Sequence, residues 1–357
     1  MTVAGTVAVA GATGIVGRGY LEHVAGGGTR VLALGRRAPI AAPNIAHRPV
    51  DLTRPEQVRA LAPHLAGVDR LVYAAVADDA DVVAGWGTEA HVERNRAMLA
   101  GLLDVLAAAA PGLRHVVVLQ GTKAYGTTLG RFRLPARESD PRPALTNFYW
   151  AQEDLLRARQ PGSGWTWTIL RPTAVVGVAE RCNINILGSA AVYAAVSREL
   201  GRDLHFPGTN EHEVWQLVDN HLVGEVVDWA LSRPDPGNEI FNVSNGDASN
   251  WESLWPVVAA HFGMAVGPAR PQRLAETMPG HADLWRAMAA RHGLANPVMA
   301  DLVSWPVFDG HVRRDHNAYV STLKLRAHGF GGFRDSLDTF AAKLRAMAGA
   351  RLIPSGG

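Results

Sequence analysis

Short apolar segments that alternate with helix-like stretches constrain the fold of this chain more than any other feature of its sequence. These segments span residues 6–10, 30–34, 46–50, 69–75 and 114–119. Each is bounded by turn-forming residues and is typical of a strand buried on both faces, as in a parallel sheet. Between them helices are expected, including one over 55–64 and a longer one near 90–109, where apolar residues recur with the 3.6-residue period of a helix. The alternation predicts an α/β fold, a doubly wound parallel sheet of the Rossmann type.

The second half of the chain predicts a smaller, mainly helical part that is interleaved with the first. A strand is expected over 166–171, and after it the alternation gives way to longer helices, the clearest over 186–200. A later apolar run at 239–243 is expected to return to the main sheet. We therefore predict a dinucleotide-binding domain over 1–180, completed by that strand, and a substrate-binding part over 181–357.

Composition narrows the classes of function. The 357 residues include 35 basic and 33 acidic side chains, a net charge of +2, without a basic tract that would indicate a nucleic-acid partner. No apolar run reaches ~18 residues and the N-terminus lacks the features of a signal peptide, so no membrane span is expected. The histidines lack metal-ligand spacing, and no metal site is expected. With Cys182 as the single cysteine, these features predict a cytoplasmic protein.

A glycine run directly after the first expected strand predicts a dinucleotide site. Gly11, Gly14 and Gly17 form a G-x-x-G-x-x-G spacing at the start of a helix. Backbone amides at a helix start can approach a pyrophosphate only where side chains are out of the way. Such glycines also occur simply to let a helix pack closely on a strand. The cofactor contacts expected from this loop are Gly11, Thr13, Gly14, Ile15, Val16 and Gly17.

The residues after the second strand favour NADPH over NADH. An NAD enzyme places a carboxylate there to hold the ribose hydroxyls, whereas this chain has Arg36 and Arg37. Guanidinium groups favour a 2′-phosphate, although an isolated arginine pair at a strand end is more often simply solvated. Asp51 and Leu52, after the third strand, and Ala74, at the end of the fourth, are expected to complete the cofactor contacts. Asp51 could equally cap a helix.

The catalytic candidates are Tyr149 and Lys123. In short-chain dehydrogenases a tyrosine at the start of a helix is followed four residues later by a lysine, but here that residue is Glu153. A carboxylate there would favour the neutral phenol. The chain has only three lysines, and Lys123 follows the 114–119 strand, at the sheet edge where open α/β folds bind ligands. We expect Lys123 to supply the missing cation.

A series of motifs extends from residue 11 to residue 334. They read GATGIVG, RR, LQGTKAYG, NFYWAQEDLL, WTWTILRPTAVVG, FNVSNGD and HGFGGFR. Together they resemble the progesterone 5β-reductase and iridoid synthase-like family, an atypical extended short-chain dehydrogenase group that reduces activated carbon–carbon double bonds. The resemblance covers nearly the whole chain. It implies the extended short-chain dehydrogenase fold, and its departures suggest a bacterial-type branch.

The resemblance also assigns roles to residues. The first tyrosine of the family's NFYY motif falls on Tyr149, and the lysine of its TGxKHY motif falls on Lys123. The second tyrosine is replaced by Trp150 and the histidine after the lysine by Ala124, changes that would reshape the substrate pocket. Phe330 resembles an aromatic residue that closes that pocket, with core packing as the alternative.

The predicted chemistry is reduction of an activated double bond. A hydride from NADPH would add to the β-carbon of an α,β-unsaturated carbonyl, while Tyr149 and Lys123 stabilise the enolate oxygen. The expected partner is a small enone or enal, bordered by Trp150 and by Asn185 past the sixth strand; Asn95 is expected in a polar network. A homodimer is left open. The rivals are NADP-dependent carbonyl reduction or epimerase/dehydratase chemistry on the same fold, and a non-catalytic NADP(H)-binding redox sensor.

Overall fold

The chain forms two compact units that are interleaved along the sequence. The computed structural model describes residues 5–79, 85–127, 129–179, 182, 184–233 and 237–356. The first unit comprises Met1–Thr173, Asn220–Val243 and Val320–Gly332. The second comprises Ala174–Asp219, Ser244–Tyr319 and Phe333–Gly357. Each unit therefore consists of three separate stretches of chain.

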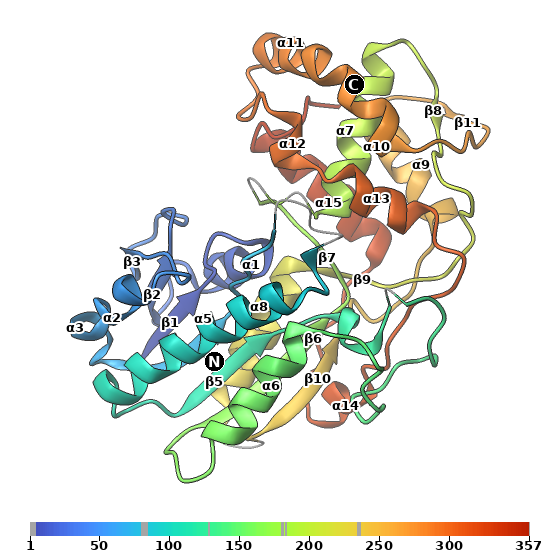
Figure 1. Ribbon diagram of the computed structural model, residues 1–357. Helices are drawn as coiled ribbons and strands as arrows, with labels where there is room; N and C mark the ends of the chain where they lie inside the picture. The colour runs from blue at the N-terminus through green and yellow to red at the C-terminus, as the bar shows by residue number, and fades with distance from the viewer. Residues whose placement is uncertain are drawn as a thin grey trace. The chain divides into compact units, whose positions relative to one another are not determined.

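A seven-stranded parallel sheet forms the centre of the first unit (Figure 1). Its strands are β1 (Thr6–Ala10), β2 (Arg30–Gly35), β3 (Ile45–Pro49), β4 (Val68–Tyr73), β5 (His115–Leu119), β6 (Thr166–Pro172) and β10 (Glu239–Val243). They lie in the order β10-β6-β5-β4-β1-β2-β3, with every neighbouring pair parallel. The strand order reverses between β1 and β4, and this switch point is where doubly wound sheets bind ligands, at the carboxyl ends of the strands.

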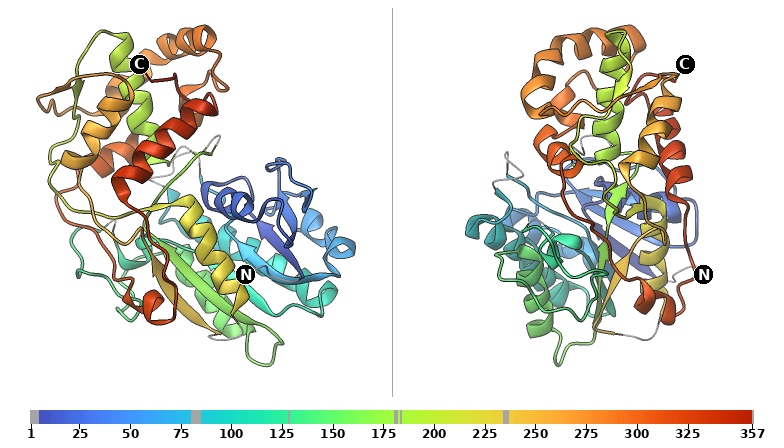
Figure 2. Two further views of the ribbon diagram at one scale, coloured as in Figure 1. Left: turned by 180° about the vertical axis from the view of Figure 1, so that it is seen from behind. Right: turned by 90° about the vertical axis from the view of Figure 1, so that its right-hand side faces the viewer.

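Helices cover both faces of this sheet. They are α1 (Ile15–Val24), α2 (Pro55–Arg59), α3 (Ala62–Leu65), α5 (Glu89–Ala109), η1 (Thr122–Tyr125), α6 (Phe148–Arg159), α8 (Asn220–Ser232) and α14 (Leu323–Ala327). Helices α5 and α6 pack together on one face, and α1 packs with α8 on the other, as the right-hand view of Figure 2 shows for α5, α6 and α8. Strands β1, β5 and β6 are buried almost throughout because helices lie on both sides.

The second unit is mainly helical, and its core is rich in aromatic residues. Its elements are β7 (Ala174–Val176), α7 (Ile186–Glu199), β8 (Leu204–His205), β9 (Leu217–Asp219), α9 (Trp251–His261), β11 (Val266–Gly267), α10 (Leu274–Thr277), η2 (Met278–His281), α11 (Ala282–His292), α12 (Met299–Leu302), α13 (Trp305–Val312) and α15 (Ser336–Gly349). Helix α7 is buried over nearly its whole length. Trp251 and Trp255 lie on the buried face of α9 and pack edge-to-face, with ring centroids 5.8 Å apart.

The sequence predicted the strands of the main sheet and the helices α1, α5, α6 and α7, with two differences from the structure. The helix expected over 55–64 is divided into α2 and α3, because Pro63 has no amide hydrogen to continue the bonding of the first helix. The domain boundaries are also more interleaved than the expected division at residue 180: α8 and the stretch around α14 belong to the first unit together with β10. Within the described part of the chain, no helix combines the length and apolarity that crossing a membrane requires.

Candidate active site

The glycine loop after β1 packs tightly against the backbone that directly follows β4. Gly11 has a φ of +81°, and a Cβ there would stand 2.6 Å from the backbone of Ala74. A Cβ at Gly17 would stand 2.3 Å from the carbonyl oxygen of Gly11. These two glycines are therefore required by packing. Gly14 differs, because it is exposed at the N-cap of α1 and a Cβ there would approach only the Gly11 oxygen, at 3.4 Å.

The open position at Gly14 leaves the amino end of α1 accessible at the switch point of the sheet. Thr13, Ile15 and Val16 flank it and are partly exposed. Amide groups at such a helix start are suited to hold a pyrophosphate. The loop therefore fits the dinucleotide that the sequence predicted, and the fit depends on the one glycine that packing does not require.

The other expected cofactor residues follow β2, β3 and β4 at the same edge of the sheet. Arg36 and Arg37 are exposed directly after β2. Asp51 accepts hydrogen bonds from the amide and hydroxyl of Thr53, and these bonds are the main cause that lowers the pKa of Asp51. It does not cap α2, whose N-cap is Arg54.

Two of these residues have structural roles of their own. The Leu52 side chain is buried in the core. Ala74 donates its amide to the carbonyl of Ala10, which continues the β1–β4 pairing by one residue. Both therefore have structural roles at the cofactor edge, whatever contacts they make with a ligand.

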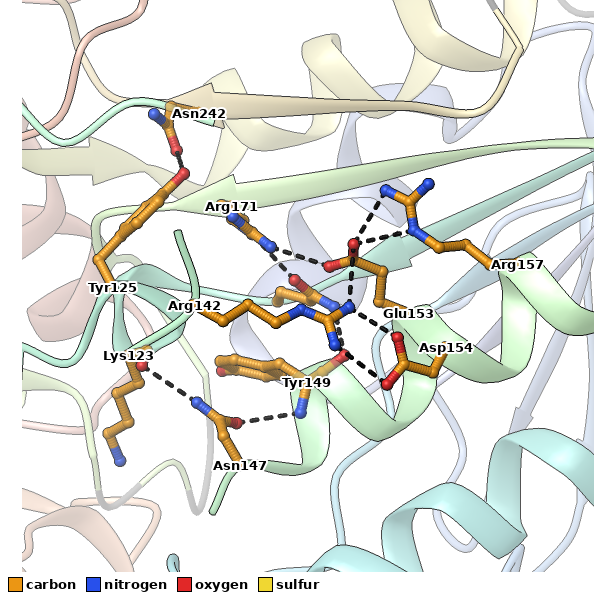
Figure 3. Close-up of polar contacts among 11 residues, drawn as sticks. Lys123, Tyr125, Arg142, Asn147, Tyr149, Glu153, Asp154, Arg157, Arg171 and Asn242 are labelled. Atoms are coloured by element: carbon orange, nitrogen blue, oxygen red, sulfur yellow. Dashed lines mark hydrogen bonds and ion pairs between the residues drawn. The ribbon is translucent and has the colours of Figure 1, made fainter. Parts of the chain in front are cut away.

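Asn147 connects the two catalytic candidates (Figure 3). Its side-chain oxygen accepts from the amide of Tyr149 at 3.0 Å and so caps α6. Its side-chain nitrogen donates to the carbonyl of Lys123, also at 3.0 Å. The first turn of α6, which holds the tyrosine, is thereby fixed to the turn that holds the lysine, although 26 positions separate the two residues in the sequence.

Tyr149 is buried at the carboxyl edge of the sheet. Its hydroxyl lies against Gly121, where an added Cβ would stand 3.3 Å from the phenol oxygen. Burial raises the pKa of Tyr149 far above its usual range; the Asp78 carboxylate acts in the same direction and Arg171 in the opposite one. The phenol is therefore protonated at neutral pH and can donate a hydrogen bond.

Lys123 lies in the turn η1, directly after β5. Burial lowers the pKa of Lys123 to about 8, while the nearby Asp78 carboxylate acts in the opposite direction. The Nζ atom stands 3.3 Å from the centroid of the Trp86 ring. At neutral pH most Lys123 side chains are therefore ammonium groups that are only partly exposed to water.

Glu153, in the position of the usual lysine, is bound by arginines. Its carboxylate is buried and lies 3.1 Å from Arg171, 3.0 Å from Arg157 and 3.2 Å from Arg142. Figure 3 shows this carboxylate among the guanidinium groups. Arg171 also donates to Gln120, which in turn donates to the carbonyl of Tyr149. Glu153 therefore holds α6 against β6.

Three residues that the sequence did not single out surround the catalytic pair. The indole of Trp86 contacts Lys123 on its face and Tyr149 through an edge contact, with ring centroids 5.8 Å apart. His91 and Asp78 face each other, with Nε2 of the imidazole 3.7 Å from Oδ1 of the carboxylate. A local sequence signal for this part of the site was Thr88, the N-cap of α5. The positions of Trp86, His91 and Asp78 around the catalytic pair depend instead on contacts between distant segments.

The remaining expected residues have structural partners. The guanidinium of Arg142 lies over the indole of Trp150, with the Cζ atom of the arginine 5.9 Å from the ring centroid. Asn185, in the second unit, caps α7 and donates to the carbonyl of Gly177. Phe330 is buried and packs against Trp229 of α8, which is the core packing weighed as its alternative.

Asn95 forms the polar network that was expected of it. It is fully buried, accepts from the amide of Ala77 at 2.9 Å and donates to the carbonyls of Ala77 and His91. It thus fixes the connection after β4 that carries Asp78. Its role is to position the edge of the site.

The chain is similar to known proteins over nearly its whole length. The family model for PRISE-like Rossmann-fold domains matches residues 57–318. An (S)-8-oxocitronellyl enol synthase of Nepeta cataria is 30% identical over 373 residues, which cover 97% of this chain and 91% of that protein. A short chain dehydrogenase of Penicillium aethiopicum is 31% identical over 73% of this chain and 74% of its own.

Solved structures share the fold. The Bordetella bronchiseptica enzyme WbmG, in complex with NAD and UDP, has a TM-score of 0.68 at 15% identity, covering 97% of this chain and 96% of its own. A Thermus thermophilus UDP-glucose 4-epimerase in complex with NAD has a TM-score of 0.67 at 19% identity, over 97% and 99%. The Rossmann architecture follows from these matches, and from the family model and the sequence relatives we conclude that the chain belongs to the PRISE-like Rossmann-fold family.

Proposed function

We propose that this oxidoreductase of the PRISE-like family reduces the activated double bond of an enone or enal with NADPH. The observation that carries the proposal is a buried tyrosine, kept protonated, and a partly buried lysine, mostly charged at neutral pH, that contact the same indole of Trp86. The relatives support it, since several are named as enol synthases. An enol, or its enolate, is what hydride addition to an α,β-unsaturated aldehyde gives.

The proposed chemistry places each group according to its charge. When bound, NADPH would supply the hydride that adds to the β-carbon. The electrons of the double bond would then shift to give an enolate with its negative charge on the carbonyl oxygen, where the Tyr149 hydroxyl donates a hydrogen bond and the Lys123 ammonium adds positive potential. A proton from solvent would then add to the α-carbon and give the saturated carbonyl. A donor of this kind contributes roughly 3–4 kcal/mol to the transition state. Tyrosinate could not donate this bond, so the raised pKa of Tyr149 supports the role.

The preference for NADPH rests on Arg36 and Arg37. Both are exposed at the carboxyl end of β2. Because β2 pairs in parallel with β1, this end lies next to the glycine loop that follows β1. A 2′-phosphate would be attracted by two guanidinium groups. The Asp51 carboxylate, in the next connection, is held by Thr53.

The reaction is tested with a panel of enones and enals. We expect NADPH oxidation with 2-cyclohexen-1-one, citral or progesterone, a saturated carbonyl as the product, and a loss of about 100-fold or more in kcat for Tyr149→Phe. The matched control is Tyr20→Phe, which removes a buried hydroxyl from α1 and is expected to leave kcat unchanged. A saturated alcohol from the same substrates would indicate carbonyl reduction instead. If NADPH binds to wild type and no substrate is turned over, the sensor hypothesis replaces ours.

The cofactor preference is tested in the same assay. Replacing both arginines by alanine should raise the Kd for NADPH much more than that for NADH, because only NADPH carries the 2′-phosphate. Arg30→Ala, at the amino end of the same strand, is the control and should change neither. Equal weakening of both cofactors by the double variant would contradict the assignment.

A further inference from the structure

Trp86 contacts both catalytic candidates, although no pattern in the sequence assigned it a role. We infer that Trp86 is a positioning residue for Lys123: the face of its indole holds the ammonium beside Tyr149. The Nζ atom stands 3.3 Å from the ring centroid, well within the ~6 Å of an effective cation–π contact. The Tyr149 ring meets the indole edge-on, at an interplanar angle of 78°. The catalytic part of the inference rests on the proposed function, while the contact itself does not.

The indole is fixed from several sides. The carbonyl of Trp86 lies 3.1 Å from Nδ1 of His91, which is buried in the first turns of α5. The Trp86 ring packs at 5.4 Å from that imidazole and at 5.1 Å from Phe148. Thr88 closes the turn by accepting from the amide of His91 and donating to the carbonyl of Gly85. Trp86 is therefore anchored to α5 and α6 independently of Lys123.

The electrostatic surroundings explain why an aromatic face suits this lysine. Burial lowers the pKa of Lys123, so the ammonium needs stabilisation to remain charged. Asp78 faces it from the connection after β4, but burial raises the pKa of that carboxyl, and 32% of its side chain is still exposed. His91 from α5 and Tyr149 from α6 are the other titratable groups that face the indole. A ring face stabilises the cation without pairing it to an anion that would compete with the enolate.

The chain is suited to a direct test, because it has only three lysines. Reductive methylation with ¹³C-formaldehyde keeps each lysine charged and makes it visible by NMR. Lys324, paired with Glu239, and Lys343, paired with Asp219, serve as internal references. We expect the N-methyl signal of Lys123, assigned by its loss in Lys123→Arg, to be shifted upfield by the indole ring current.

Two replacements of similar size separate stacking from space filling. Trp86→Phe keeps an aromatic face, whereas Trp86→Leu keeps an apolar side chain without one. We expect the upfield shift to persist in the Phe variant and to disappear in the Leu variant. The pKa of Lys123 should be lower in the Leu variant than in the Phe variant by about one pH unit. Equal pKa values and equal chemical shifts in the two variants would overturn the inference, because a merely structural tryptophan would not distinguish them.

Turnover gives the second readout. If an enone is reduced, kcat/KM should fall as the pH rises through the pKa of Lys123, about 8 in the free protein. That limb should move to lower pH in Trp86→Leu relative to Trp86→Phe. An unshifted limb would contradict the positioning role. If no enone is reduced, the proposed function fails, but the NMR comparison still decides whether Trp86 holds the lysine.

Discussion

At position 153 the surrounding charges decide which residue can be accommodated. Replacing Glu153 by lysine would restore the usual Tyr-x-x-x-Lys spacing, yet the new ammonium would be buried among Arg142, Arg157 and Arg171. Removing one partner of a buried pair costs roughly 3–5 kcal/mol, and like-charge repulsion adds to it. We expect Glu153→Lys to lower the free energy of unfolding by at least that amount, measured by urea denaturation.

The matched variant is Glu153→Gln, which keeps the shape and an acceptor and should lose less stability than the lysine variant. A lysine variant as stable as wild type, with activity retained after Lys123→Met, would show that the usual spacing can work in this fold. We do not expect that outcome, because the three arginines supply positive charge that balances a carboxylate at position 153 and would repel an ammonium there.

His115 links stability to pH through its burial in the sheet. Its ring nitrogens lie 2.7 Å from Oγ1 of Thr166 and 3.0 Å from Oγ1 of Thr168, and burial lowers the pKa of His115 from 6.5 to about 4. Between these values the unfolded chain binds a proton that the folded chain does not. Stability should therefore fall as the pH is lowered from about 6.5 to about 4, by up to roughly 3 kcal/mol from this residue.

This linkage is measured by comparing wild type with His115→Asn in urea at about pH 7 and about pH 4.5. Carboxyl groups contribute equally to both proteins, so the difference between their pH dependences isolates the imidazole. His212→Gln is the control, since that histidine is exposed and paired with Glu252 at the surface. Identical slopes for wild type and His115→Asn would contradict the prediction.

At the scale of elements, the crossing of α1 and α8 depends on glycines at the contact. A Cβ at Gly19 would stand 2.1 Å from the carbonyl oxygen of Asn220, and one at Gly224 would stand 2.6 Å from the carbonyl oxygen of Gly19. We expect Gly19→Ala to cost about 1–3 kcal/mol, as overpacking of a close contact does. Gly101→Ala in α5 is the matched control, because nothing lies within 4 Å of its Cβ position.

The control should behave in the opposite way. Alanine is favoured over glycine in a helix by about 1 kcal/mol, so Gly101→Ala should raise the midpoint of thermal unfolding while Gly19→Ala lowers it. Equal shifts in the two variants would mean that the helices can separate without cost. Circular dichroism melting curves suffice to distinguish these results.

Local signals predicted elements well where the responsible residues are neighbours in the sequence. A helix start at Tyr149 was predicted, and α6 begins one residue earlier, capped by Asn147. The returning strand β10 was predicted from its apolar run. The pairing of Asn147 with the carbonyl of Lys123 was not predicted, since nothing in the spacing shows which loop the cap faces. Trp86 was missed for the same reason.

At the scale of the whole molecule, the interleaving of the two units was underestimated from the sequence. Helix α8 reads as one more helix of the second half, and its contacts with α1, β5 and β6 place it in the first unit. Periodicity reports that a helix has a buried face but not what covers it. The stretch Val320–Gly332 is similar, because its bridge to Ala136 joins residues far apart in the chain.

This interleaving predicts which parts can fold alone. Residues 1–180 lack α8, so the apolar face that α1 shares with it would be exposed, and they lack β10, so β6 would become an unprotected edge. We expect this fragment to bind ANS and to unfold without cooperativity. A chain that joins Met1–Thr173, Asn220–Val243 and Val320–Gly332 through Gly/Ser linkers restores both elements and should unfold cooperatively in urea. Cooperative unfolding of 1–180 by itself would show that α8 and β10 are additions to a self-sufficient domain rather than parts of its core.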